Sequence, residues 1–202
     1  MLLRILIIGV VFALLIGGGL AWMIERPEAA GTPVISTPVK NDRIGGPFQL
    51  IDQTGRTVTD EDFRGRYLLI YFGYTYCPDV CPAELQIMSS ALDKLGSDAG
   101  RIQPLFVTVD PERDTVDVMA QYVSHFNPQL LGLTGTVDQV ARMAKEYKVY
   151  FAKQEPERGG DKAYSVSHSS LIYLMSPSGR FIDHFSFGTN PDEMASRIKS
   201  HL

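Results

Sequence analysis

The sequence predicts an α/β domain built on a mixed β-sheet with helices on both faces. Three observations lead to this expectation. Tyr67–Phe72 is aliphatic or aromatic at every position, as in a central strand that is covered on both faces. A helical pattern and a second apolar run, Leu105–Val109, come next, in the order strand, crossover helix, parallel strand. Near the C-terminus, Leu171–Met175 and Phe181–Phe185 flank the short turn Ser176–Gly179 and predict a hairpin.

The composition is that of one folded domain with an appendage. The chain has 202 residues, of which 45% are hydrophobic, and this is enough for a single buried core. The formal net charge is -4, and the Lys and Arg residues form no cluster. Both features argue against nucleic acid as a partner.

The appendage is an apolar stretch at the N-terminus. Residues 5–24 contain no charged side chain, and a helix of this length covers about 30 Å, the thickness of the hydrocarbon core of a bilayer. We therefore expect residues 1–24 to be a membrane anchor that crosses the inner (cytoplasmic) membrane once, with the remaining chain on the exported, periplasmic side. A cleaved signal peptide is the alternative, although the stretch is long for one and no A-x-A site closes it.

Behind the anchor we expect a tether and then the domain. Residues 25–40 are rich in Pro, Ala, Gly, Thr and Ser without periodicity, which fits an extended linker. The domain then occupies residues 41–202. Its first strand is Phe48–Ile51, and the turn Asp52–Gly55 leads into Thr57–Phe63, which fits a second short strand and a helical turn.

The helix after the central strand has apolar residues three or four positions apart, namely Leu85, Met88, Leu92 and Leu95. Gly96 is a suitable residue to end it. After Leu105–Val109, the segment Asp110–Thr115 can cap a second helix. The apolar face of that helix consists of Val118, Met119, Tyr122 and Phe126.

The C-terminal half begins with a capping box. Thr136 and Gln139 form this box at the start of a third helix. A strand at Val149–Ala152 and a polar loop at Lys153–Lys162 are expected next, and Pro191 opens the last helix after the hairpin. The order is strand, helix, strand, two helices, two strands and a helix. Such an order is typical of a thioredoxin-like arrangement.

The only two cysteines, Cys77 and Cys81, lie between the central strand and its helix. A disulfide between them would close a very short loop and stabilise the fold little, so a chemical role explains them better than a structural one. Thiols near a helix start ionise easily, and Pro78 is compatible with the first helical position. From the residues alone, a metal site and a metal-free redox dithiol are about equally supported. A peroxidase would need an arginine partner, and no arginine is close in sequence.

Four segments together resemble one family: FGYTYCPDVCPAEL, TVDPERDT, LLGLTGT and SVSHSSLIYLMSPSGRF. From about Gly46 to the end, the chain resembles the Sco/SenC family. Its members are membrane-anchored copper proteins with a thioredoxin-like fold that assist assembly of the binuclear copper site of cytochrome c oxidase. The resemblance implies that Cys77, Cys81 and His168 are the copper ligands and that Asp110 lies near the site. Residues 41–202 would then be a thioredoxin-like copper-binding domain.

The resemblance also implies a function. We expect a copper chaperone, not an enzyme with turnover on a small substrate, that receives copper ion, Cu(I) and/or Cu(II), from an upstream donor and passes it to subunit II of cytochrome c oxidase. Two thiolates suit Cu(I), and an added imidazole suits Cu(II). The alternative is a thiol-disulfide oxidoreductase that reduces the cysteines of that subunit, with Cys77 and Cys81 as its redox disulfide.

Two of the implied roles have a structural reading as well. A lone histidine that enters a strand is more often structural than a ligand. The ligand role of His168 therefore requires its segment to lie beside the turn that carries Cys77 and Cys81, which we call the cysteine turn. The motif that Asp110 opens is also a good helix cap without any function. Two positions depart from the family pattern: Tyr76 stands where many members have histidine, and Ser167 where many have aspartate. No metal role is therefore assigned to Tyr76.

Overall fold

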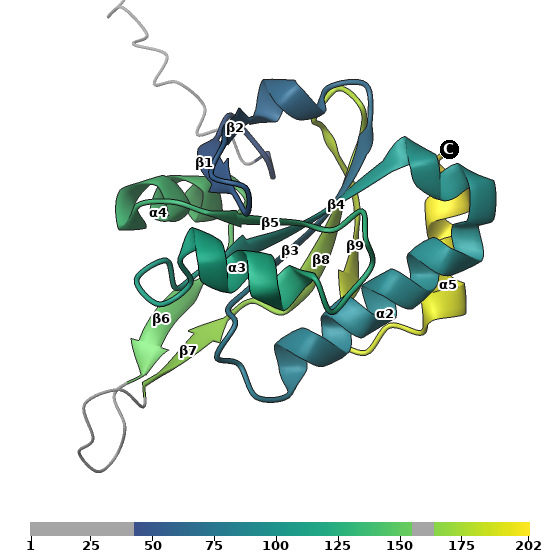
Figure 1. The fold of residues 1–202 in the computed structure, drawn as a ribbon. Helices are drawn as coiled ribbons and strands as arrows, with labels where there is room; N and C mark the ends of the chain where they lie inside the picture. The colour runs from purple at the N-terminus through teal and green to yellow at the C-terminus, as the bar shows by residue number, and fades with distance from the viewer. Residues whose placement is uncertain (1–42, 155–163) are drawn as a thin grey trace, which may run out of the picture. The chain divides into compact units, whose positions relative to one another are not determined.

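The structure is a computed structural model that describes residues 43–154 and 164–202. In these ranges seven strands form one mixed sheet in the order β2-β1-β5-β4-β3-β8-β9 (Figure 1). The strands are β1 (Gln49–Asp52), β2 (Thr57–Thr59), β3 (Tyr67–Gly73), β4 (Ile102–Thr108), β5 (Leu131–Thr134), β8 (Leu171–Met175) and β9 (Phe181–Ser186). Strands β3, β4 and β5 run parallel, and β8 pairs with β3 in the antiparallel sense. The predicted mixed sheet and the predicted hairpin are confirmed.

Helices cover both faces of the sheet, as expected. Strand β3 is followed by α2 (Val80–Leu95), and β4 is followed by α3 (Val116–Val123). Both connections cross over to a parallel neighbour in the same direction along the sheet, so right-handed crossovers bring both helices to one face. On this face Tyr71 of β3 stacks on Phe106 of β4, which packs against Tyr122 of α3.

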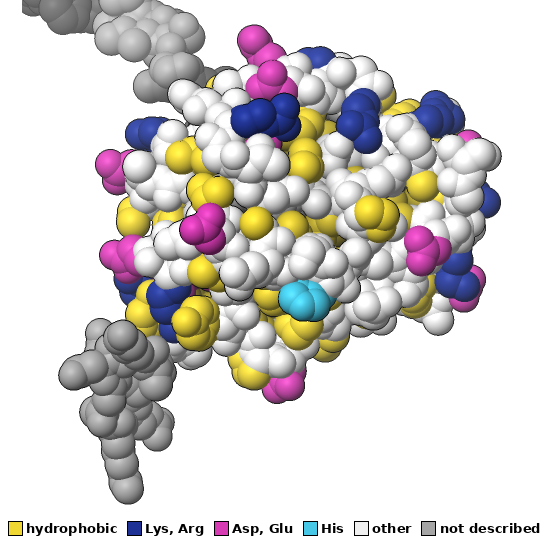
Figure 2. All heavy atoms as spheres, viewed as in Figure 1, with side chains coloured by type: hydrophobic (Ala, Val, Ile, Leu, Met, Phe, Trp, Pro, Cys, Tyr) yellow, Lys and Arg dark blue, Asp and Glu magenta, His cyan; other side chains and the backbone are white. Residues whose placement is uncertain are grey.

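The remaining helices complete the two layers. Helix α5 (Pro191–Lys199) joins the face of α2, with Arg197 above the ring of Phe185. Helix α4 (Val137–Glu146) lies on the other face, where Tyr147 at its end contacts the rings of Phe72 and Tyr173. Two 3-10 helices, η1 (Asp60–Phe63) and η2 (Gly96–Arg101), connect the elements. On the face drawn in Figure 2, acidic and basic side chains are interspersed.

A second, two-stranded sheet stands apart from the main one. It consists of β6 (Phe151–Gln154) and β7 (Ser165–His168), which pair antiparallel with Phe151 opposite His168 (Figure 1). We call these two strands the arm. Among the described strands, those of the arm pair only with each other. Most of the predicted polar loop Lys153–Lys162 lies outside the described residues.

Several element boundaries differ from the expectation. Strand β5 was not expected, because its four residues include Gly132, whose place in a strand depends on tertiary packing. A Cβ atom there would stand 2.9 Å from Val123, so α3 needs a glycine beneath it. Strand β7 was also not expected, since only Val166 of its four residues is buried. Helix α2 begins at Val80 and not at Pro78, and Asp79 stands at the capping position without a side-chain capping bond.

The membrane prediction concerns other residues. The predicted anchor 1–24 and the tether 25–40 lie outside the ranges that the structure describes. Within the described ranges, none of the helices has the length and hydropathy needed to cross a bilayer.

Candidate metal centre

Cys81 lies at the buried base of the cysteine turn. It sits in the first turn of α2, and its side chain is fully buried. Two side chains from other elements reach its sulfur. The hydroxyl of Tyr71 on β3 donates a hydrogen bond to Cys81 Sγ over 3.6 Å, and His168 Nε2 from the arm lies 3.5 Å from the same atom. Strand, helix and arm therefore meet at one sulfur.

Gly73, the last residue of β3, makes room for this sulfur. A Cβ atom at position 73 would stand 2.8 Å from Cys81 Sγ and 2.9 Å from the ring of Phe106. Both distances are shorter than side-chain carbons tolerate in a close-packed interior. A residue with a side chain here would displace the buried thiol.

Cys77 is half-buried and so lies closer to the surface than the buried Cys81. The backbone N–H of Cys81 donates to Cys77 Sγ over 3.3 Å. The pKa of Cys77 is lowered to about 5, first because the Cys81 side chain is hydrogen-bonded to it and then because the N–H groups of Cys81, Asp79 and Val80 point at its sulfur. The helix starts later than expected, but its first N–H groups still stabilise a thiolate, as the sequence predicted.

The two cysteines are electrostatically unequal. The pKa of Cys81 is raised, first by its hydrogen bond to Cys77 and then by burial. Of the two thiols, Cys77 therefore ionises more easily and Cys81 holds its proton more tightly. The more easily ionised sulfur is the less buried one, which a cation can reach.

His168 is oriented with its unprotonated nitrogen toward the sulfur. Its Nδ1 lies 3.1 Å from the backbone carbonyl of Ser169. A carbonyl only accepts, so Nδ1 donates this bond, and in the neutral imidazole the lone pair is then on Nε2, the nitrogen that faces the sulfur. The rings of Tyr71 and Tyr74 pack edge-on against the imidazole, at centroid distances of 6.2 and 5.9 Å. The neutral imidazole thus presents Nε2 toward Cys81 Sγ, in an orientation suited to a metal ligand.

The spacing of sulfur and nitrogen fits a shared ion. Ligands at about 2.3 Å (sulfur) and 2.0 Å (nitrogen) from one ion are about 3.5 Å apart at a tetrahedral angle. This is the distance between Cys81 Sγ and His168 Nε2. However, among residues 43–154 and 164–202 no three His, Cys, Asp or Glu side chains already form a group that could hold a metal ion. The Cys81–His168 pair is therefore in place, and Cys77 does not yet complete a three-ligand group with it.

An open hollow of about 290 Å³ lies in front of the pair. Cys77, Pro78 and Val80 line one side, and Val166 and His168 of the arm line the other. The hollow gives a small ion or a partner side chain access to Cys77 and to the imidazole.

Asp110 lies beside the arm and makes no hydrogen bond to either sulfur in the described residues. It is buried, pairs with Arg113, and accepts a hydrogen bond of 2.7 Å from the hydroxyl of Tyr164. The guanidinium of Arg113 lies over the rings of Tyr164 and Tyr76. An arginine thus reaches the cysteine turn from a distant part of the sequence, although none is close to the turn in the sequence. Tyr76 itself is exposed and covers this guanidinium.

Three residues that the sequence analysis did not single out support the site. Tyr71 and Gly73 contact Cys81 as described above. Asp114 is buried and accepts hydrogen bonds from the Thr75 N–H at 3.0 Å, the Thr75 hydroxyl at 2.6 Å and the Thr108 hydroxyl at 2.6 Å. It thereby fixes the start of the cysteine turn to the end of β4. Its only signal in the sequence is its place as the second aspartate of D-P-E-R-D-T.

Known proteins share this architecture. A family model described as SCO1/SenC matches residues 36–202. The human protein SCO1 homolog, mitochondrial, is 43% identical over 180 residues, which cover 88% of this chain and 56% of the human protein. The chain thus spans little more than half the length of that relative.

Solved structures agree with the sequence comparison. The copper-bound structure of Bradyrhizobium japonicum ScoI is 45% identical and has a TM-score of 0.72, with 79% of this chain and 99% of that one covered. BsSco is 26% identical, with a TM-score of 0.61 and coverage of 78% and 92%. It is described as a member of the Sco family of cytochrome c oxidase assembly proteins with a disulfide switch.

Proposed function

The chain belongs to the SCO1/SenC family, and on this premise we propose that it is a copper chaperone for the assembly of cytochrome c oxidase. The proposed ligands are Cys77, Cys81 and His168. One observation carries the assignment: His168 Nε2 lies 3.5 Å from Cys81 Sγ, while Nδ1 faces the backbone carbonyl of Ser169. Copper is the cargo of this site, so the chain needs no turnover on a small substrate.

The donor set suits both oxidation states of copper. Thiolates bind the soft Cu(I) ion, and imidazole adds affinity for Cu(II). Cys77 already carries the negative charge that attracts the ion, and Cys81 gives up its proton when the metal binds. Cys77 lines the same hollow as His168 and is the third ligand of the proposed site.

Release is part of the same proposal. Three protein ligands leave one face of the ion open, and the hollow between Pro78 and the arm leads to that face. A ligand of the recipient enters there and replaces the chaperone's ligands one at a time. We propose subunit II of cytochrome c oxidase as the recipient and a separate copper protein as the donor. We also propose that residues 5–24 anchor the chain in the inner membrane, with the domain on the periplasmic side.

Copper titration of the full-length chain tests this function. The reduced chain should bind one equivalent of copper. His168→Ala should lower the Cu(II) affinity by at least tenfold, because it removes one of three ligands. His125→Ala is the matched control: His125 is exposed and outside the site, so that variant should bind copper like the unmodified chain. Failure of the unmodified chain to bind copper, or equal affinities for all three, would contradict the proposal.

A thiol-disulfide oxidoreductase is the second candidate. The unequal pair favours it, because an exposed thiolate at Cys77 can attack a disulfide and the buried Cys81 can resolve the mixed disulfide. The two functions differ in their need for the imidazole. A reductase should keep its exchange rate with a model disulfide in His168→Ala, whereas a copper carrier should lose affinity in the same variant.

A further inference from the structure

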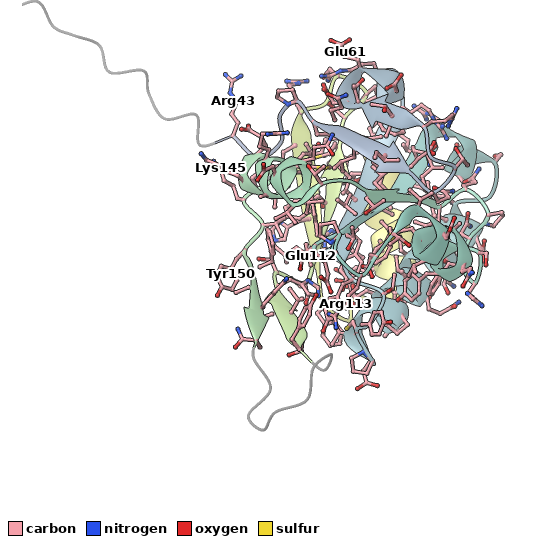
Figure 3. The ribbon with its side chains drawn as sticks, turned by 60° about the vertical axis from the view of Figure 1, so that its left-hand side comes forward. Arg43, Glu61, Glu112, Arg113, Lys145 and Tyr150 are labelled. Carbon is pink, nitrogen blue, oxygen red and sulfur yellow. The ribbon has the colours of Figure 1, made fainter. Side chains whose placement is uncertain are left out.

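The arm that carries His168 is held to the domain by the segment after β4. Three polar contacts join this segment to β6 and to Tyr164, the residue just before β7. The Tyr164 hydroxyl donates to Asp110 Oδ1 over 2.7 Å, Arg113 Nη1 donates to the Tyr164 carbonyl over 3.0 Å, and Lys153 pairs with Glu112. Figure 3 shows Glu112 and Arg113 beside the arm. Residues 110–113 and the arm are far apart in the sequence, so this attachment exists only in the folded chain.

Tyr164 is the centre of this attachment. Its hydroxyl and its carbonyl are both bonded, and the guanidinium of Arg113 lies 3.7 Å from the centroid of its ring. The acceptor is the fully buried carboxylate of Asp110, which Arg113 also pairs with. Charge-assisted hydrogen bonds to buried carboxylates are among the stronger ones. The Lys153–Glu112 pair has two half-exposed partners and contributes little.

The position of Tyr164 in the chain links it to the placement of His168. It directly precedes β7, whose last residue is His168. Strand β7 pairs with β6 and with no strand of the main sheet in the described ranges, and it joins the main sheet only at its C-terminal end, where β8 begins three residues after His168. Attachment at Tyr164 therefore holds the N-terminal end of β7 in place, four residues before His168. The imidazole at the far end must come within 3.5 Å of Cys81, which leaves little tolerance.

We propose that Tyr164, held by Asp110 and Arg113, is a positioning residue that keeps His168 at the copper site. This inference depends on the proposed function, because it concerns copper that His168 ligates. Without the Tyr164–Asp110 bond the arm moves and the imidazole contributes less to binding. Cu(II), which prefers imidazole, then loses affinity, whereas Cu(I), held by two thiolates, does not. This difference separates positioning of the histidine from general damage to the fold.

The test uses the full-length chain and Tyr164→Phe, which keeps the ring on Arg113 and removes only the hydroxyl. Its Cu(II) affinity should fall about tenfold, the effect of one hydrogen bond to a carboxylate, and its Cu(I) affinity should stay within about twofold. Tyr150→Phe is the control, because Tyr150 is an exposed tyrosine next to β6 and should leave both affinities unchanged. In a His168→Ala background, Tyr164→Phe should have no further effect on Cu(II).

A metal-free measurement keeps this inference separate from the proposed function. In the reduced, metal-free chain, nuclear Overhauser contacts between the His168 and Tyr74 rings should be present in the unmodified chain and in Tyr150→Phe, and weakened in Tyr164→Phe. Unchanged contacts in Tyr164→Phe would overturn the inference, as would an equal loss of Cu(I) and Cu(II) affinity. Absence of copper binding in the unmodified chain would instead overturn the proposed function and leave the ring contacts to decide on Tyr164.

Discussion

His168 Nε2 lies 3.5 Å from Cys81 Sγ, although 87 residues separate the two side chains in the sequence. Cys81 arrives from the first turn of α2, and His168 arrives from the end of β7. Their contact depends on the packing of the arm beside the cysteine turn. Metal binding by this pair therefore depends on how the fold places the two side chains. Residues that position them should affect metal binding without contacting the metal.

Gly73 is the first such residue. Gly73→Ala should destabilise the fold by about 1–3 kcal/mol, because the added methyl group meets Cys81 Sγ and Phe106 in a packed interior. It should also weaken copper binding by displacing the sulfur. Gly100→Ala is the control, since a Cβ atom there meets nothing within 4 Å. Chemical denaturation and copper titration of both variants check this, and equal behaviour of the two would refute the role of Gly73.

Asp114 should stabilise the cysteine turn. Asp114→Ala leaves the N–H of Thr75 and the hydroxyls of Thr75 and Thr108 without their acceptor, so we expect a loss of about 2–4 kcal/mol in the free energy of unfolding. Asp117→Ala, at an exposed position in the first turn of α3, should cost less than about 1 kcal/mol. Denaturation curves for the two variants measure the difference. A cost for Asp114→Ala no larger than that for Asp117→Ala would contradict the role.

The pH dependence of stability tests whether the pKa of Asp114 is raised in the folded chain. Burial raises the pKa of Asp114 above its ordinary value. The folded state therefore binds the proton more tightly than the unfolded state, and this group's contribution to stability falls as pH rises from the ordinary carboxyl pKa through the folded one. Asp114→Asn should remove that part of the profile. A profile unchanged by the substitution would show that Asp114 titrates normally.

Cys77 should react as a thiolate in mildly acidic solution. Its pKa of about 5 predicts that alkylation by iodoacetamide is half-maximal near pH 5, well below the ordinary thiol range, whereas buried Cys81 stays unmodified in the folded chain. Mass spectrometry of peptides from chains alkylated at a series of pH values locates the label. Cys81→Ser should shift the pH midpoint of Cys77 alkylation, because it replaces the side chain that is the main hydrogen-bond partner of Cys77. A midpoint between pH 8 and 9 in the unmodified chain would disprove the lowered pKa.

The same shift predicts a trend in stability. Because the folded-state pKa of Cys77 is depressed, its contribution to stability is present above the unfolded pKa and is lost as pH falls toward about 5. Cys77→Ser should flatten the stability profile in this window. A profile that keeps its slope there would assign the effect to another group.

Tyr71 should assist deprotonation of Cys81. Its hydroxyl donates to the sulfur and so favours the thiolate, against the larger effects of Cys77 and burial. Tyr71→Phe should therefore move the pH midpoint of copper binding upward. Tyr122→Phe is the matched control, because the buried Tyr122 hydroxyl has no hydrogen-bond partner in the described residues. Copper titrations at several pH values compare the variants, and identical midpoints would exclude the role of Tyr71.

The sequence predicted those parts of the fold that depend on local pattern. The apolar run of β3 indicated a covered central strand, and the capping box at Thr136 is formed as expected, with Gln139 N–H donating to the Thr136 hydroxyl. Asn190 and Pro191 open the last helix in the same way. In each case the residues that determine the structure are neighbours in the chain.

The parts that could not be predicted depend on distant neighbours. Strand β5 forms because Gly132 lets α3 pack on it, and no signal within its four residues reports that contact. Similarly, Asp114 resembles a capping residue, but its carboxylate is occupied by Thr75 and Thr108. The resemblance to a family implied the residues of the site, whereas the reasons for their positions, including the role of Tyr164, come from the three-dimensional arrangement.

The most direct test of the central claim is the coordination shell of bound copper. X-ray absorption spectra of the reduced, copper-loaded full-length chain should show two sulfur ligands and one imidazole nitrogen at roughly 2.0 Å. In His168→Ala the imidazole signal should disappear while both sulfurs remain. Copper without sulfur ligands in the unmodified chain, or an imidazole signal that persists in His168→Ala, would contradict a site built from Cys77, Cys81 and His168.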